Sequence, residues 1–308
     1  MAVVTETSER VVAPISSPVG EGDENQGRSW RIGKRVLGYT ILIIFALIFL
    51  GPFLLTIATS FKTRPDFAAN PLSLIPHPFT AEWWKQGLGI RASEIADVPR
   101  WFMNSLLVAG TLMVSRVFLD SLAGYALARM HFPGRRLLFA AVIGIIAVPP
   151  IVLLVPKFLV LDELGIYATY WALILPLAAD ATGIFLMKQF FEQVPRELEE
   201  AARIDGAGVF RIWWSVLLPV VRPGVITLAI LSFQGTWNEF PHMLIANNDP
   251  DLYTLPVGLA LIRGTQGEDL NFPFFLATAT LTMIPVAIVF FVFQRYFVRG
   301  LMEGAVKG

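Results

Sequence analysis

Residues 194–224 read VPRELEEAARIDGAGVFRIWWSVLLPVVRPG, a polar stretch with charges of both signs between two long apolar segments. Pro195 suits the first turn of a helix, where its missing N–H costs nothing. Gly206 and Gly208 can end that helix and turn the chain. Acidic groups near the start of a helix complement its positive end, and those present here are Glu197, Glu199 and Glu200. The stretch therefore predicts a short polar helix.

The predicted helix has a small apolar face, because Leu198, Ala201 and Ala202 are three and four residues apart. Pro219 and Pro223 should bend the chain that follows. A short polar helix between two membrane spans can act as a knob for another protein. A solvated interfacial loop, in which the tryptophans only mark the headgroup zone, accounts for the same residues.

The composition places the whole chain in a membrane. Of its 308 residues, 55% are hydrophobic and 16% charged, with a mean hydropathy of +0.61. A soluble domain of this size needs more polar surface. The formal net charge is zero, which gives no reason to expect nucleic acid as a partner. The absence of cysteine excludes disulfides and thiolate metal sites, and the three scattered histidines show no metal-ligand spacing.

Six apolar segments are long enough to cross about 30 Å of hydrocarbon. Pro149, Pro150 and Pro156 interrupt the third of them. The predicted spans are residues 36–60, 102–128, 137–160, 171–191, 214–240 and 272–297. We therefore predict an all-α integral membrane fold, with six transmembrane helices and a polar helix in the loop between spans four and five.

The distribution of basic residues predicts the orientation of the spans. Lysine and arginine gather before the first span, after the second and around residues 192–213, and such loops stay in the cytoplasm. Both termini are then cytoplasmic, and residues 241–271 are external. Residues 1–30 have few large apolar groups and are predicted to be a disordered cytoplasmic tail. Residues 31–308 form the six-span domain.

The second predicted span contains two charges. Arg116 and Asp120 are four residues apart and share a helix face, so we predict that they form an ion pair. Such a pair within a span marks a functional site by default. The alternative is a buried pair that fixes helix packing.

The sequence contains no recognisable catalytic motif. The pair Gly33-Lys34 is followed by Arg35 rather than Ser or Thr, so no phosphate-binding loop is present. Nucleophile-elbow and zinc-protease motifs are also absent. We therefore predict no enzyme activity, no catalytic residue and no metal site. Active transport would need energy from an ion or from a partner protein.

The order Glu200-Ala201-Ala202, Ile204-Asp205-Gly206-Ala207 and Leu218-Pro219 resembles the EAA loop of bacterial ABC-importer permeases. More narrowly, residues from about 36 to 308 resemble the MalG-type carbohydrate permeases. The resemblance implies a short helix that seats in a groove of a cytoplasmic ATPase and transmits its closure. The residues that take these coupling positions are Leu198, Glu200, Ala201, Ala202, Asp205, Gly206 and Gly208.

The resemblance also implies a set of partners in the bacterial plasma membrane. A second permease would complete the pathway, two ATPase subunits would bind below, and a solute-binding protein would deliver the solute from outside. ATP and Mg would bind the ATPases, and no cofactor would bind this chain. The C-terminal residues resemble a tail that reaches between the two ATPases, and the contacting residues would be Gly304, Lys307 and Gly308. Met302-Glu303 departs from the usual uncharged pair, and a frayed terminus is the alternative.

The outer half of span five is the predicted solute pathway. Aromatic faces stack on sugar rings, and amide or carboxylate groups bind hydroxyls. The predicted contact residues are Gln234, Trp237, Asn238 and Glu239. The same cluster suits a membrane interface, where Trp is enriched. The external loop from Thr254 to Asn271 corresponds to the segment that meets the binding protein in this family.

We therefore predict the permease subunit of an ABC importer for a sugar or oligosaccharide. One alternative is an importer of the same type for another polar solute, such as a glycerol phosphate, which a row of Arg or Lys along the pathway would favour. A second is an ion-coupled secondary transporter, which needs repeated broken helices with ion ligands. A membrane-embedded structural subunit is a third.

Overall fold

The computed structural model describes residues 21–93 and 96–305, and all of its regular elements there are helices. The predicted all-α class is therefore confirmed for the part of the chain that is described. The chain divides into two units, residues 1–54 and 55–308, which are described separately below.

The first unit consists mainly of one long helix. Helix α1 (Glu21–Thr59) extends from this unit into the next. Its residues Arg35–Thr59 are apolar enough to cross a membrane, and the large apolar side chains along them are exposed, as a lipid-facing helix requires. Residues 1–20 of the predicted tail lie outside the described residues, while residues 21–30 belong to α1.

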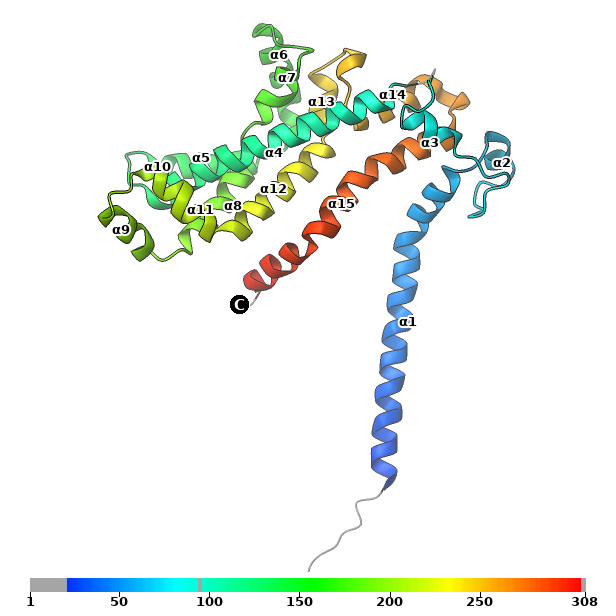
Figure 1. Cartoon of the computed structure of the whole chain (residues 1–308), viewed down its shortest axis with the longest axis horizontal. Coiled ribbons are helices and arrows are strands. Elements are labelled where there is room, and N and C mark those ends of the chain that lie inside the picture. The colour runs from blue at the N-terminus through cyan, green and yellow to red at the C-terminus, as the bar shows by residue number, and fades with distance from the viewer. Residues whose placement is uncertain (1–20, 94–95, 306–308) are drawn as a thin grey trace, which may run out of the picture. The chain divides into compact units, whose positions relative to one another are not determined.

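The second unit is built around α4 (Val98–Arg129), on which α8 (Ala181–Glu192) and α12 (Arg222–Trp237) pack. Helix α15 (Phe272–Ala305) packs in turn on α12 (Figure 1). Helices α4 and α8 approach closely at Gly124, because a Cβ there would lie 2.8 Å from the backbone N of Lys188. Small residues permit this type of close helix packing in membranes.

Three of the predicted spans are broken helices. The bends are 99° between α5 (Arg135–Ile146) and the segment Pro150–Glu163, 41° between Tyr170–Leu177 and α8, and 87° between Val209–Val220 and α12. In the described part of the chain, three unbroken helices are long and apolar enough to cross a membrane, and the count reaches six when each bent pair is one span. The predicted interruption at Pro149 and Pro150 is confirmed, since α5 ends just before them. The predicted interruption at Pro156 is wrong, because Pro156 lies in the first turn of α6 (Leu154–Glu163), where a missing N–H costs nothing.

The predicted span five is not a straight helix near its predicted start at residue 214. Residues 212–217 form a π-helix, η3 (Ile212–Leu217), followed by the short α11 (Leu218–Val220). This segment turns by 87° into α12. Pro219 and Pro223 lack the N–H donors that would continue one straight helix, so the apolar run contains a corner.

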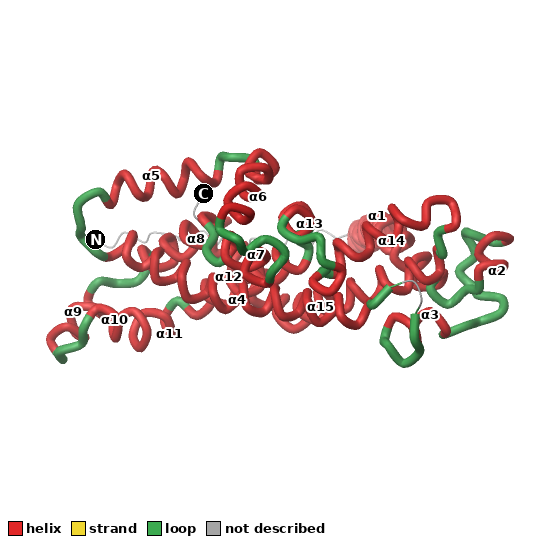
Figure 2. The backbone as a smooth tube through the Cα atoms, turned by 90° about the horizontal axis from the view of Figure 1, so that it is seen from above, coloured by secondary structure: helices red, strands yellow, loops and turns green. Residues whose placement is uncertain are grey.

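Short helices fill the connections. They are α2 (Arg64–Ala69), α3 (Glu82–Gly87), η1 (Pro150–Leu153), α6 (Leu154–Glu163), α7 (Tyr170–Ile174), η2 (Leu175–Leu177), α9 (Glu197–Ile204), α10 (Val209–Arg211), α13 (Pro241–Ile245), η4 (Pro250–Leu252), α14 (Leu255–Gln266) and η5 (Gly267–Asp269). Within the second unit, α9 and α10 lie at the opposite end from α2 and α3 (Figures 1 and 2). This placement fits loops on opposite sides of a membrane.

Candidate functional site

The polar stretch folds as the sequence predicts. Helix α9 spans Glu197–Ile204, and Gly206 follows with a φ of +77°, the left-handed conformation that ends many helices. Two details differ from the prediction. Pro195 lies just before the helix rather than in its first turn, and Gly208 has a φ of −71° and precedes α10. We call residues 194–221 the α9 loop.

The two faces of α9 differ in exposure. Glu199 and Ala202 are buried against the rest of the chain, whereas Ile204 is 87% exposed. The predicted apolar face of Leu198, Ala201 and Ala202 lies on the observed helix and runs across the boundary between the two faces, because Leu198 and Ala201 are exposed and Ala202 is buried. The exposed surface of α9 includes Leu198, Glu200, Ala201 and Ile204, with Asp205 and Gly206 at its end.

Arg129, the last residue of α4, fixes the buried face of α9. Its side chain is 5% exposed, and its Nε lies 3.2 Å from Oε1 of Glu199, which is 8% exposed. The same guanidinium donates to the backbone carbonyls of Phe191 and Val194. One arginine thus joins α4 to the end of α8 and to α9. In the sequence, Arg129 served only as one of the basic residues that predict a cytoplasmic loop. Nothing local points to partners so far along the chain.

A second contact holds the other half of the α9 loop on α4. Trp213 is fully buried, and its ring meets that of Phe118 edge-on, with centroids 5.5 Å apart. Phe210 and Trp214 pack on the same indole. The loop is therefore fixed to α4 at both of its halves, by a charge and by an aromatic ring.

The predicted ion pair between Arg116 and Asp120 is wrong. Arg116 Nε donates to the carbonyl of Leu177 over 2.8 Å, and Asp120 Oδ1 accepts the N–H of Asp180 over 2.9 Å. Both side chains bind free backbone groups at the break between η2 and α8. Buried backbone groups require partners, and a broken helix leaves them there. The two charges therefore hold the break in α7–α8.

The four predicted pathway residues differ in burial. Trp237 is 1% exposed, and its Nε1 donates to the carbonyl of Thr282. Because the rings of Phe102 and Phe233 pack on it, Trp237 is a packing residue here and offers no face to a sugar. Gln234 and Asn238 are exposed, and the half-buried Glu239 accepts the N–H of His242.

The other predicted site residues lie at the C-terminus. Gly304 belongs to α15, whereas Lys307 and Gly308 lie outside the described residues. Within the described part of the chain, no group of three or more His, Asp or Glu side chains could hold a metal ion.

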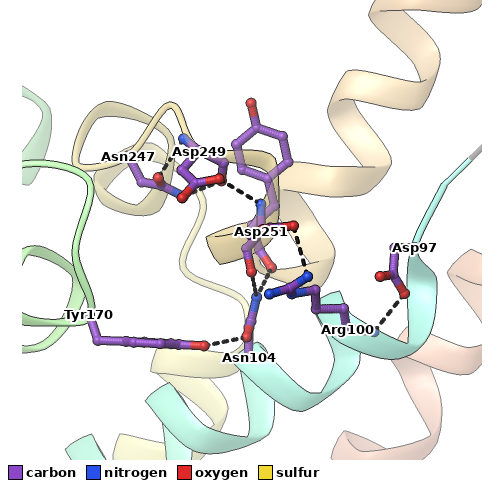
Figure 3. Close-up of polar contacts among 8 residues, drawn as sticks. Asp97, Arg100, Asn104, Tyr170, Asn247, Asp249 and Asp251 are labelled. Carbon is purple, nitrogen blue, oxygen red and sulfur yellow. Dashed lines mark hydrogen bonds and ion pairs between the residues drawn. The ribbon is translucent and has the colours of Figure 1, made fainter.

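At the far end of α4, polar contacts hold the loop between α13 and α14, residues 246–254 (Figure 3). Asn104 Nδ2 donates to the carbonyls of Asp251 and Tyr253, and its Oδ1 accepts the hydroxyl of Tyr170 over 2.7 Å. Arg100 pairs with Asp251 over 2.8 Å. This α13–α14 loop leads into the segment that the sequence assigned to a binding protein.

Known proteins resemble this chain over most of its length. The family described as "Binding-protein-dependent transport system inner membrane component" matches residues 121–303. The trehalose/maltose transport system permease MalG of Thermococcus litoralis is 34% identical, over 89% of this chain and 98% of its own length. The sn-glycerol-3-phosphate permease UgpE of Brucella abortus (strain 2308) is 31% identical, over 88% of this chain and 96% of its own.

A solved structure has the same fold. It is a bacterial ABC transporter involved in the import of the acidic polysaccharide alginate, and one of its chains superposes with a TM-score of 0.74 at 23% identity. The match covers 88% of the present chain and 98% of the other.

Proposed function

This chain belongs to the family of binding-protein-dependent transport system inner membrane components, and we propose that it is the permease subunit of an ABC importer for a sugar or oligosaccharide. Such permeases are multi-pass membrane proteins, and ATP hydrolysis takes place on other subunits. The chain forms six spans, counting each bent pair as one, and a second permease completes the pathway. An extracytoplasmic binding protein supplies the solute.

The observation that carries the proposal is the arrangement of α9. Its exposed face presents Leu198, Ala201 and Ile204 to solvent, an apolar surface on an otherwise polar helix. Its buried face is fixed to α4 through Arg129 and Glu199. A helix that is firmly attached to a span and exposes apolar groups on its other face suits a docking element. We propose that α9 seats in a groove of a cytoplasmic ATPase subunit and transmits its movement to α4 and α8.

Glu200 provides a test of this docking. Its exposed carboxylate would meet a basic group in the groove, so Glu200→Lys introduces a like-charge clash. We expect about tenfold weaker uptake and less co-purified ATPase, because like charges in an interface cost several kcal/mol. Glu197→Lys, also exposed and on the same helix, is the matched control and should keep most of both. Equal behaviour of the two variants would contradict the docking of α9.

The orientation follows from the same proposal. With α9 and both termini in the cytoplasm, Ile204→Cys should resist a membrane-impermeant thiol reagent in intact cells, and Asn248→Cys should react. Both positions are exposed, and the natural chain has no cysteine to interfere. Labelling of Ile204→Cys but not Asn248→Cys would reverse the orientation. In the proposed orientation, the C-terminal residues Gly304, Lys307 and Gly308 lie on the ATPase side of the membrane. We propose that they contact both ATPases there.

The two leading candidate functions differ in the solute that is imported. The MalG relative is a trehalose/maltose permease, and the UgpE relative is a glycerol-3-phosphate permease, so an importer of a phosphorylated polyol is the second candidate. The complete complex, reconstituted with its ATPase, second permease and binding protein, should take up a carbohydrate with ATP. ATP-independent uptake driven by an ion gradient would overturn the proposal. Preferred uptake of glycerol 3-phosphate would favour the second candidate.

A further inference from the structure

A pocket lined by basic side chains lies at the end of α4 that holds α9. It has a volume of about 780 Å³, and its basic lining residues are His131, Arg135, Arg136 and Lys188. They come from the connection after α4, from the first turn of α5 and from α8. No described acidic residue lines this pocket, which we call the basic pocket.

Two of the four basic side chains are held in place by contacts within the chain. Arg135 donates from Nε and Nη2 to the carbonyls of residues 127 and 128 in the last turn of α4, over 2.7 Å and 3.1 Å. Lys188 Nζ lies 2.7 Å from Oε1 of Glu192 and 4.2 Å from the ring centroid of Phe139. Glu192 balances the charge of Lys188, whereas neutral carbonyls leave the charge of Arg135 uncompensated.

The other two basic side chains have no such contacts. His131 and Arg136 are exposed and make no hydrogen bond or ion pair with the described residues. The pocket thus gathers two arginine charges that no described carboxylate balances. Cations held close together repel one another, and an anion between them removes that cost. Because a guanidinium can donate two parallel hydrogen bonds to phosphate oxygens, the pocket suits a phosphate group.

The surface beside the pocket indicates the source of that phosphate. Directly after the two arginines, Leu137 and Leu138 are 76% and 54% exposed, and no residue of α5 is buried within the chain. An exposed apolar helix next to a cluster of cations offers one surface for acyl chains and one for a headgroup. In the proposed orientation this end of α4 is cytoplasmic, and basic pockets between membrane helices on that side bind anionic lipid headgroups.

We propose that the basic pocket binds the phosphate group of an anionic phospholipid, whose acyl chains lie along α5. The inference rests on the proposed orientation and does not depend on the imported solute. The pocket adjoins the attachment of α9, since Arg135 binds the carbonyl of Ala128 and the next residue, Arg129, pairs with Glu199. A bound lipid therefore adds to the contacts that join α4, α5 and α8 at this end.

Arg136→Gln gives the sharpest test, because Arg136 is exposed and its loss breaks no contact with the described residues. The full chain, delipidated in a neutral detergent, is titrated with phosphatidylglycerol or with phosphatidylcholine, which has no net charge. Native mass spectrometry measures the bound lipid. We expect phosphatidylglycerol to bind the more tightly. Arg136→Gln should weaken its binding about fivefold, the effect of one basic residue near an anionic lipid surface, and Arg136→Lys should retain most of it. Without lipid, these variants should unfold at the wild-type temperature.

Arg211→Gln is the matched control. Arg211 is an exposed arginine of α10, at the same end of the second unit and outside the pocket wall, so its loss should leave lipid binding unchanged. Equal weakening by Arg136→Gln and Arg211→Gln would overturn the inference, as would equal binding of the two lipids. Displacement of phosphatidylglycerol by inorganic phosphate or glycerol 3-phosphate at similar concentrations would overturn the lipid as the source of the phosphate.

The complete complex provides the last arm of this test. Phosphatidylglycerol should bind the complex as it binds the chain alone, with the same loss in Arg136→Gln. Binding to the chain that disappears in the complex would overturn the inference in favour of an acidic segment of a partner protein. None of these measurements uses transport, so a negative result leaves the proposed importer function standing.

Discussion

Helix α4 holds a loop at each of its ends through an ion pair, and the two ion pairs differ in their exposure to solvent. Arg129 and Glu199 meet over 3.2 Å with side chains that are 5% and 8% exposed. Arg100 and Asp251 meet over 2.8 Å with side chains that are 50% and 61% exposed. The shorter contact is thus the one that solvent screens. Burial, rather than distance, therefore decides which ion pair costs more stability when it is broken.

The buried hydrogen-bonding groups at the two ends of α4 also differ, because they are neutral at one end and charged at the other. At the α13–α14 loop, the buried groups are uncharged: Asn104 and Ser105 are 4% and 3% exposed, and they bind backbone groups of that loop and of Leu255 at the start of α14. At the α9 loop, the backbone carbonyls of Phe191 and Val194 are bound by a charged group, Arg129. Such a connection suits a loop that transmits movement, because one cation ties three segments together. We therefore expect substitutions at the two ends of α4 to differ strongly in their effects.

The largest effect is expected for Arg129→Met. This change leaves Glu199 buried without its nearest cation and leaves two carbonyls without their donor, and should cost about 3–5 kcal/mol of stability. Thermal unfolding of the purified protein in detergent measures it. The double variant Arg129→Met/Glu199→Met should be more stable than Arg129→Met alone. Arg136→Met, which replaces an exposed arginine in the first turn of α5, should unfold like wild type. A double variant less stable than the single would argue against the pairing.

A smaller effect is expected at the turn after α9. Gly206 has a φ of +77°, so Gly206→Val strains the backbone by about 1–3 kcal/mol and misdirects α9 without unfolding the spans. Membrane insertion should remain normal, while uptake by the complex is lost. Gly208→Val is the matched control, since Gly208 has a φ of −71° and an added Cβ there would have no atom within 4 Å. Equal loss of uptake in both variants would show that the added side chain disturbs the contact surface, and that backbone strain at Gly206 is not the cause of the loss.

Local signals in the sequence were sufficient for part of this structure. The glutamates and Gly206 predict α9 to within two residues of its observed start, and the prolines predict two of the three bends in the apolar segments, but not the one before α8. These features depend on neighbours along the chain, where helix capping and missing N–H donors act. The family resemblance then rested on the same stretch.

Contacts between distant segments could not be predicted in this way. The spacing of Arg116 and Asp120 allows a pair, yet free backbone groups at the η2–α8 break bind both of them instead. Trp237 lies in an aromatic pattern that suits a sugar, but packing against Phe102 and Phe233 buries it. The pairing of Arg129 with Glu199 depends on how α4 and α8 pack, and no local pattern encodes that packing.

The smallest effect is expected for Arg100→Met at the far end of α4. Its ion pair with Asp251 is exposed to solvent, so its loss should cost only about 0–1 kcal/mol and less at high salt. Asn104→Leu provides the contrast within the same network, because it leaves the Tyr170 hydroxyl and two loop carbonyls without their partner. Thermal unfolding at low and high salt compares both with Arg129→Met. If Arg100→Met destabilised the protein as much as Arg129→Met, burial would not rank these two attachments, and the contrast between the ends of α4 would have to be abandoned.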